Sequence, residues 1–126
     1  MVELEPITVV LTSVGTQQQA VEISDELVHR RLATCVNVIP CQRSVYRWKG
    51  KVCSDSEFLL LIKTRASLFQ SVVDAIHELH SYELPEILEL PPGRVEASFH
   101  SWVAAMATGV PDPDGDDVPE PETAYD

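Results

Sequence analysis

Polar and apolar side chains alternate along the middle of the chain, and this pattern predicts a long hairpin of two β-strands. The first strand is predicted over Cys35 to Trp48 and the second over Lys51 to Lys63, with the turn at Lys49-Gly50. The second strand ends in the apolar run Phe58 to Ile62, which needs a hydrophobic core around it. A hairpin of this length in a chain of 126 residues is expected to project beyond its own domain. Such an arm needs a partner to cover it, so the pattern predicts assembly.

The first strand of the hairpin is interrupted at Pro40, which lacks the amide hydrogen that a strand ladder uses. A bulge or an edge position is therefore predicted there. Beyond this point Ser44, Tyr46 and Trp48 fall on one face of the strand, because successive side chains point to opposite sides.

Helical spacing of apolar residues appears on both sides of the hairpin. The segments Thr16-Gln-Gln-Gln19 and Ser67-Leu-Phe-Gln70 both have the pattern of a capping box. Apolar positions three and four residues apart follow each of them, which predicts two helices. The first is predicted to end near Ala33 and the second to stop by Ser81. The remaining predicted elements are a strand at Ile7 to Leu11, a strand at Glu86 to Leu90 and a short helix over roughly Ser98 to Ala107.

The predicted order of elements is βαββαβ followed by a C-terminal helix, which indicates an α+β fold of the ferredoxin-like class. In this class an antiparallel sheet carries both main helices on one face, so the other face stays open. We expect the open face to pack against other subunits. The ferredoxin-like domain is predicted over residues 1–107. The acidic, proline-rich segment 108–126 is predicted to be a disordered tail, because it has almost nothing to bury.

Charge and composition exclude several kinds of partner. The formal net charge is -11, but seven of the twenty acidic residues lie in segment 108–126, so the body holds thirteen acidic residues against nine Lys and Arg. A mildly acidic body argues against binding to nucleic acid, whose protein partners are basic. No apolar stretch approaches the ~20 residues that a membrane helix needs. The three cysteines have no CxxC spacing, and a reducing cytoplasm is the expected compartment.

Sequence motifs of catalysis are absent. The chain has no nucleophile elbow, Walker loop, Rossmann glycine pattern or HExxH. With five glycines in the whole chain, a phosphate cradle is also hard to place. The protein is therefore predicted not to be an enzyme.

Four short blocks follow one another in a recognisable order. They are Ala33-Thr-Cys-Val-Asn37, Ser44-Val-Tyr-Arg-Trp-Lys-Gly50, Leu59-Leu-Leu-Ile-Lys-Thr64 and His80-Ser-Tyr-Glu-Leu-Pro-Glu86. Together they resemble the CutA family of divalent-cation-tolerance proteins, over about residues 7 to 105. The resemblance implies a ferredoxin-like fold similar to that of PII signalling proteins. It also implies a homotrimer in which the sheets pack around the threefold axis and the long hairpins reach onto neighbouring subunits.

The resemblance further implies a role in the response to metal ions, with binding of copper (Cu²⁺) or another divalent cation at a cleft between subunits. By position, the family's proposed ligands correspond to Thr12, His80 and Glu86. Thr12 departs from the pattern, because it stands where the family has a cysteine and a hydroxyl is a poor replacement for a thiolate. Ser81 stands in place of the usual proline. His80 and Glu86 are thus the predicted metal ligands, and folding is not expected to require the metal.

The sequence alone allows two interpretations for several side chains. His80 at a helix end could simply complement the helix dipole, or it could line a polar cleft together with Glu86 and Glu83.

Tyr46 and Trp48 fit either an interface between subunits or an aromatic cleft for a small ligand, and Tyr82 is a candidate for lining that cleft. Lys63 could reach solvent from a strand end or attract an anionic ligand in the cleft.

The leading hypothesis is a cytoplasmic, non-enzymatic homotrimer that acts in divalent-cation tolerance and binds neither nucleic acid nor membranes. One alternative is a PII-like signalling module that binds a small organic ligand. Another is a trimeric scaffold that holds protein partners without any small ligand.

Overall fold

A four-stranded antiparallel sheet forms the centre of the computed structural model, which describes residues 5–111. In chain order the elements are β1 (Ile7–Val14), α1 (Gln17–His29), β2 (Cys35–Trp48), β3 (Lys51–Arg65), the 3-10 turn η1 (Ala66–Leu68), α2 (Phe69–Leu79), β4 (Ile87–Leu90) and α3 (Ala97–Met106). The strands lie side by side in the order β2-β3-β1-β4. This order is that of the ferredoxin-like βαββαβ fold, so the predicted fold class is confirmed.

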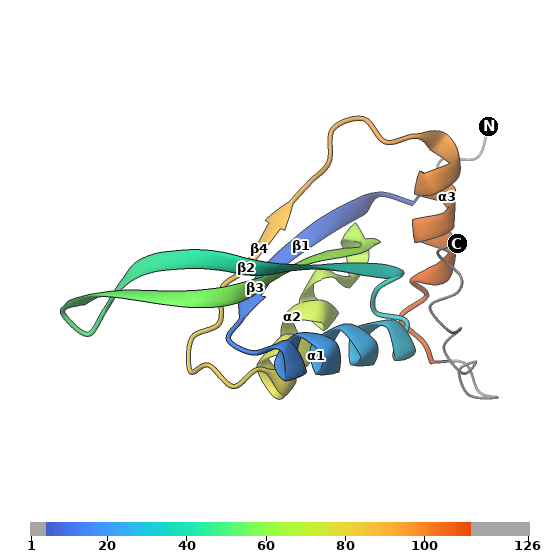
Figure 1. The fold of residues 1–126 in the computed structure, drawn as a ribbon. Helices are drawn as coiled ribbons and strands as arrows, with labels where there is room; N and C mark the ends of the chain where they lie inside the picture. The colour runs from blue at the N-terminus through green and yellow to red at the C-terminus, as the bar shows by residue number, and fades with distance from the viewer. Residues whose placement is uncertain (1–4, 112–126) are drawn as a thin grey trace, which may run out of the picture.

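The helices α1 and α2 pack together on one face of the sheet (Figure 1). Side chains from both helices and from the central strands form one fully buried core there. Its largest members are Val10, Ile23, Leu27, Leu60, Ile62, Val72 and Ile76. We call this side of the sheet the covered face and the opposite side the open face.

The two predicted capping boxes have different outcomes. Thr16 caps α1 as predicted, since its hydroxyl accepts a hydrogen bond of 3.1 Å from the amide of Gln19. The prediction at Ser67 is wrong: Leu68 is the N-cap of α2, and no side chain caps that end. The 3-10 turn places Ser67 within a turn rather than before the helix, and its hydroxyl donates to the carboxylate of Glu5 over 3.3 Å.

The helices end where the backbone geometry requires it. The first helix was expected to reach Ala33, but α1 ends at His29 because Arg31 adopts a left-handed conformation with φ of 56°. The amides of Leu32 and Ala33 then fold back onto the carbonyl of Leu27. The second helix ends at Leu79, which agrees with the predicted stop.

The hairpin of β2 and β3 extends well beyond the helices, so the predicted arm is confirmed (Figure 1). Lys49 and Gly50 form its two-residue turn, with φ of 50° and 81°. Two positive φ angles are typical of the type I′ turn, whose twist matches that of the flanking strands.

The predicted interruption at Pro40 is also confirmed, because the register of β2 against β3 shifts between Ile39 and Gln42. Ile39 pairs with Leu59 before the shift, and Gln42 pairs with Glu57 after it. Directly opposed residues of two strands point to the same face of the sheet. Before the bulge, the odd-numbered residues of β2 point to the open face, and after it the even-numbered residues do. The bulge therefore brings the aromatic side chains of the arm onto the open face.

The C-terminal helix α3 lies across the end of the sheet farthest from the hairpin turn (Figure 1). The Thr34 hydroxyl donates to the Val103 carbonyl, and the Arg65 guanidinium donates to the Ala104 carbonyl, both over 2.6 Å. The amide of Gly109 donates to the carbonyl of Arg31 over 2.9 Å, so the first residues of the predicted tail still contact the body. The rest of the predicted tail, residues 112–126, lies outside the described residues.

Candidate functional site

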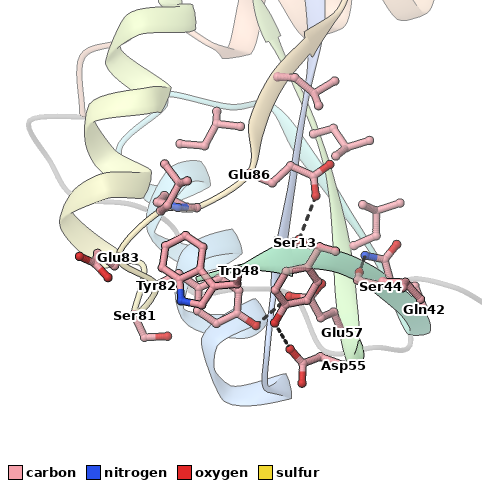
Figure 2. A pocket seen from close by; sticks show the side chains of 18 of the residues that line it. Ser13, Gln42, Ser44, Trp48, Asp55, Glu57, Ser81, Tyr82, Glu83 and Glu86 are labelled. Atoms are coloured by element: carbon pink, nitrogen blue, oxygen red, sulfur yellow. Dashed lines mark hydrogen bonds between the residues drawn. The ribbon is translucent and has the colours of Figure 1, made fainter. Parts of the chain in front are cut away.

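A groove of about 1080 Å³ lies on the open face, between the base of the arm and the loop that joins α2 to β4 (Figure 2). Leu11, Leu59 and Leu88 contribute its apolar lining from three neighbouring strands. They come together because β1 lies between β4 and β3. Leu11 of β1 pairs with Leu88 of β4, and Ser13 of β1 pairs with Leu59 of β3. The open face thus provides a site of the size that small ligands occupy.

Three aromatic side chains line the groove. Tyr46 and Trp48 come from the arm, and Tyr82 comes from the α2–β4 loop. All three were predicted as cleft-lining residues. Lys63, which was predicted with them, does not line this groove: it pairs with Cys35 and lies farther along the sheet, past the apolar lining.

Both tyrosines donate hydrogen bonds to carboxylates within the groove. The Tyr82 hydroxyl donates to Glu57 Oε2 over 2.7 Å, and the Tyr46 hydroxyl donates to Asp55 Oδ2 (Figure 2). The bond to Asp55, together with desolvation, raises the pKa of Tyr46 to about 12. Burial, followed by the bond to Glu57, raises the pKa of Tyr82 even further. Both phenols are therefore neutral donors near pH 7.

Carboxylates outnumber bases around the groove. Asp55, Glu57, Glu83 and Glu86 line it, against Arg47 as the one basic lining residue among those described. Only 6% of the surface of Glu57 is exposed. The side-chain ion pairs found in the described part of the chain join Arg30 to Glu26 and Glu78, far from the groove.

His80 fixes the loop that carries Tyr82. Its ring is only 8% exposed, with Nε2 lying 2.7 Å from the carbonyl of Ser13 and Nδ1 accepting a bond of 3.1 Å from the amide of Tyr82. Since a carbonyl can only accept and an amide can only donate, the imidazole is neutral and carries its proton on Nε2. The side chain of Gln19 strengthens the loop by bonding the carbonyl of Leu79 and the amide of Ser81.

The residues that correspond to the family's metal ligands do not converge in one chain. Thr12 is fully buried on the covered face, and its Oγ1 has no hydrogen-bond partner. Its neighbour Ser13 points to the other side of the strand and donates to Glu86 Oε2 over 3.3 Å (Figure 2). Both nitrogens of His80 are already bonded to the backbone. Among the side chains that the structure describes, no three of His, Cys, Asp or Glu are grouped as a metal site would need. Thr12, His80 and Glu86 therefore do not fit a complete copper site within one chain.

Several residues that shape the groove were not predicted from the sequence. Gly15 is one, because a Cβ atom at that position would lie 2.8 Å from the Tyr82 hydroxyl. Glu57, Ser13 and Gln19 are further examples, through their bonds to the loop residues. One signal for Glu57 was present in the sequence: an acidic residue directly precedes the apolar run of the second hairpin strand.

The fold and the groove together define a ferredoxin-like α+β protein with a long hairpin arm and an acidic, aromatic groove on its open sheet face. The family model "CutA1 divalent ion tolerance protein" matches residues 8–106, and the chain belongs to this family. The resemblance inferred from the four sequence blocks is therefore confirmed.

Individual relatives agree with the family assignment. The chain is 40% identical over 95 residues to "Divalent-cation tolerance protein CutA" of Thermus thermophilus, covering 75% of this chain and 92% of that protein. It is also 40% identical over 96 residues to "Protein CutA" of Homo sapiens, covering 76% of this chain and 54% of the human protein. The chain thus spans about half the length of the human relative.

Solved structures show the same fold. The CutA1 structure from Thermus thermophilus superposes with a TM-score of 0.77 at 38% identity, covering 79% of this chain and 97% of that one. The CutA1 structure from Oryza sativa superposes with a TM-score of 0.78 at 32% identity, covering 85% and 95% of the two chains. Among the helices that the structure describes, none has the length and apolar character needed to cross a membrane.

Proposed function

We propose that this protein acts in the cellular response to divalent metal ions, as a cytoplasmic, non-catalytic homotrimer. Membership of the CutA1 divalent ion tolerance family is the observation that carries the proposal. The relative from Thermus thermophilus bears the name of divalent-cation tolerance, and its match covers nearly the whole of that protein.

The open face and the arm support self-association. Ile39, Leu88 and Leu90 lie on the open face with 43%, 38% and 45% of their surfaces exposed. The ring pair Phe99 and Trp102 on α3 is also exposed. Apolar and aromatic side chains of this kind are stabilised when a second surface removes them from water. Packing of sheets around a threefold axis would cover both groups.

A divalent cation would need ligands from more than one copy of the chain. Glu86 is exposed at the edge of the groove and can offer a carboxylate oxygen. His80 can become a ligand only by giving up one of its two bonds to the backbone. We therefore propose that copper (Cu²⁺) or another divalent cation binds at a cleft between subunits, where a second copy completes the coordination. Cu²⁺ is a suitable probe because it binds nitrogen and oxygen ligands most tightly of the first-row divalent metals.

Calorimetric titration of the tag-free protein with Cu²⁺ tests this proposal. Glu86→Gln removes the charge while preserving the size of the side chain, and we expect it to weaken binding at least tenfold. Glu22→Gln, at an exposed position on α1, is the matched control and should bind as the wild type does. Equal uptake of Cu²⁺ by the wild type and a His80→Ala/Glu86→Ala variant would rule out the proposed site.

A further inference from the structure

The carboxylate of Glu57 is the most unusual group in the groove. It is 94% removed from solvent, since 6% of the residue is exposed, and its one side-chain partner is the Tyr82 hydroxyl. No Lys, Arg or His of the described chain forms an ion pair with it. A buried carboxylate without a counter-charge is costly, so a positive charge placed beside it would be bound favourably.

The surroundings of Glu57 favour a particular kind of positive charge. The rings of Tyr46, Trp48 and Tyr82 line the same groove, and aromatic faces attract cations through their quadrupoles. Trp48 already does so within the chain, where the Lys49 ammonium lies 5.7 Å from its ring centroid. Both phenols direct their hydrogens to carboxylates, which leaves the ring faces as the surfaces that a ligand would meet.

Metal coordination does not explain this end of the groove. A divalent ion needs several nitrogen, oxygen or sulfur ligands at short distance, and the described residues contain no such group of three acidic, His or Cys side chains. Aromatic rings supply no such ligand atoms but provide apolar area for a carbon skeleton. The apolar lining of Leu11 and Leu59 adds to this area.

We propose that the groove binds a small organic cation, an amine or a guanidinium compound. Its charged nitrogen pairs with Glu57, and its carbon skeleton lies against the rings of Tyr82 and Trp48. The groove volume of about 1080 Å³ accommodates a ligand of this size. This proposal names Glu57 and the aromatic rings as the binding groups, whereas the metal proposal names His80 and Glu86, so the two can be tested separately.

Calorimetry with agmatine, which carries a guanidinium and an amine on a four-carbon chain, tests the proposal on the full chain in the presence of EDTA. EDTA removes metal ions, so a failure of the Cu²⁺ experiment does not affect this one. Hexane-1,6-diol is a neutral probe of similar length and glutarate is an anionic one. We expect agmatine to bind at least tenfold more tightly than either. Equal affinity for the diol, or no binding of agmatine at millimolar concentration, would overturn the proposal.

Variants identify the side chains that hold the cation. Glu57→Gln keeps an acceptor for the Tyr82 hydroxyl but removes the charge, and it should weaken agmatine binding at least tenfold. Glu22→Gln is the matched charge control and should leave the affinity unchanged. If Glu57→Gln fails to fold by circular dichroism, Trp48→Ala on the exposed arm replaces it, with the same expected loss. Wild-type affinity in a folded Glu57→Gln or Trp48→Ala variant contradicts the assignment.

Discussion

The two faces of the sheet are built from the same strands but have opposite characters. On the covered face, Val10, Leu60 and Ile62 are completely buried against α1 and α2. On the open face, their neighbours Leu11 and Leu61 are only partly buried. The helices α1 and α2 both lie on the opposite side of the sheet (Figure 1). Side chains alternate between the two faces along a strand, so neighbouring residues of one strand lie in the core and on the open face.

Polar residues differ between the faces in the same way. Thr8 and Thr64 on the covered face are buried and satisfied, by Glu89 and by the carbonyl of Leu32 respectively. On the open face, the Glu57 carboxylate lies in a groove beside aromatic rings, where its side-chain partner is the Tyr82 hydroxyl. A buried hydroxyl with a partner costs little, whereas a carboxylate without a cation favours a ligand. This difference supports the proposal that the open face is the binding face, while the covered face supplies the core.

The largest expected effect compares one leucine from each face. Leu60→Ala removes a fully buried side chain from the core, and we expect it to lower the free energy of unfolding by about 3 kcal/mol. Leu88 is 38% exposed on the open face of the single chain, so Leu88→Ala should cost less than about 1 kcal/mol of the stability of each chain, apart from any loss of self-association. Urea denaturation at one fixed protein concentration measures both, because the stability of an assembly depends on concentration.

The open-face variant has a second readout. If subunits pack on this face, Leu88→Ala should weaken self-association in sedimentation analysis, while Leu60→Ala should not do so in its folded fraction. Equal losses of unfolding free energy for the two variants would remove the distinction between the faces. A folded wild-type monomer at micromolar concentration would contradict the proposed assembly.

A smaller effect is expected from two threonines on the covered face of β1. Thr12 Oγ1 is buried without a partner, so Thr12→Val should raise the free energy of unfolding by about 1 kcal/mol. Thr8 has a partner, since its hydroxyl donates to Glu89 over 2.9 Å. Thr8→Val should therefore lower the free energy of unfolding by about 1 kcal/mol. Thermal and urea denaturation compare the pair, and changes of the same sign would contradict this account.

The smallest effect concerns the phenols of the groove at alkaline pH. The pKa of Tyr46 is raised from 10.0 to about 12, mainly by its bond to Asp55, and that of Tyr82 is raised as well, mainly by burial. Because the folded pKa exceeds the unfolded value, the unfolded chain loses these protons first. Stability contributed by the phenols is complete below pH 10 and falls as the pH rises towards 12.

Absorbance at 295 nm during alkaline titration measures the deprotonation of Tyr46, and denaturation at pH 9 and 11 measures the change in stability. Tyr46→Phe should abolish the step near pH 12. It should also lower the pKa of Tyr82 slightly, because the charge of Tyr46 is the smallest of the causes that raise it. A Tyr46 phenol that titrates at its ordinary pKa would show that the bond to Asp55 does not persist in solution.

Local patterns were sufficient for most of the fold. The alternation of the hairpin, the turn at Lys49-Gly50 and the cap at Thr16 depend on neighbouring residues, and the structure agrees with each of them. The cap at Ser67 failed because a 3-10 turn held by other contacts preceded the helix. Sequence spacing alone does not distinguish a residue before a helix from a residue inside a turn.

The candidate site was predicted only in part. Tyr46, Trp48 and Tyr82 were named from their residue types and their places on the arm and the loop, and they line one groove. Glu57 and Gly15 were missed, because the role of each depends on contact with Tyr82 from a distant part of the chain. Such contacts are invisible to periodicity.

By itself, the sequence determined the order of the elements, the long arm and the family, because these follow from local periodicity, turn chemistry and short ordered blocks. Only the tertiary structure decided that the bulge turns the aromatic residues of the arm to the open face and that His80 bonds the backbone through both nitrogens. It also placed Thr12 on the covered face, away from Glu86. Each of these outcomes depends on strand register and long-range packing, which bring together residues that are far apart in the chain.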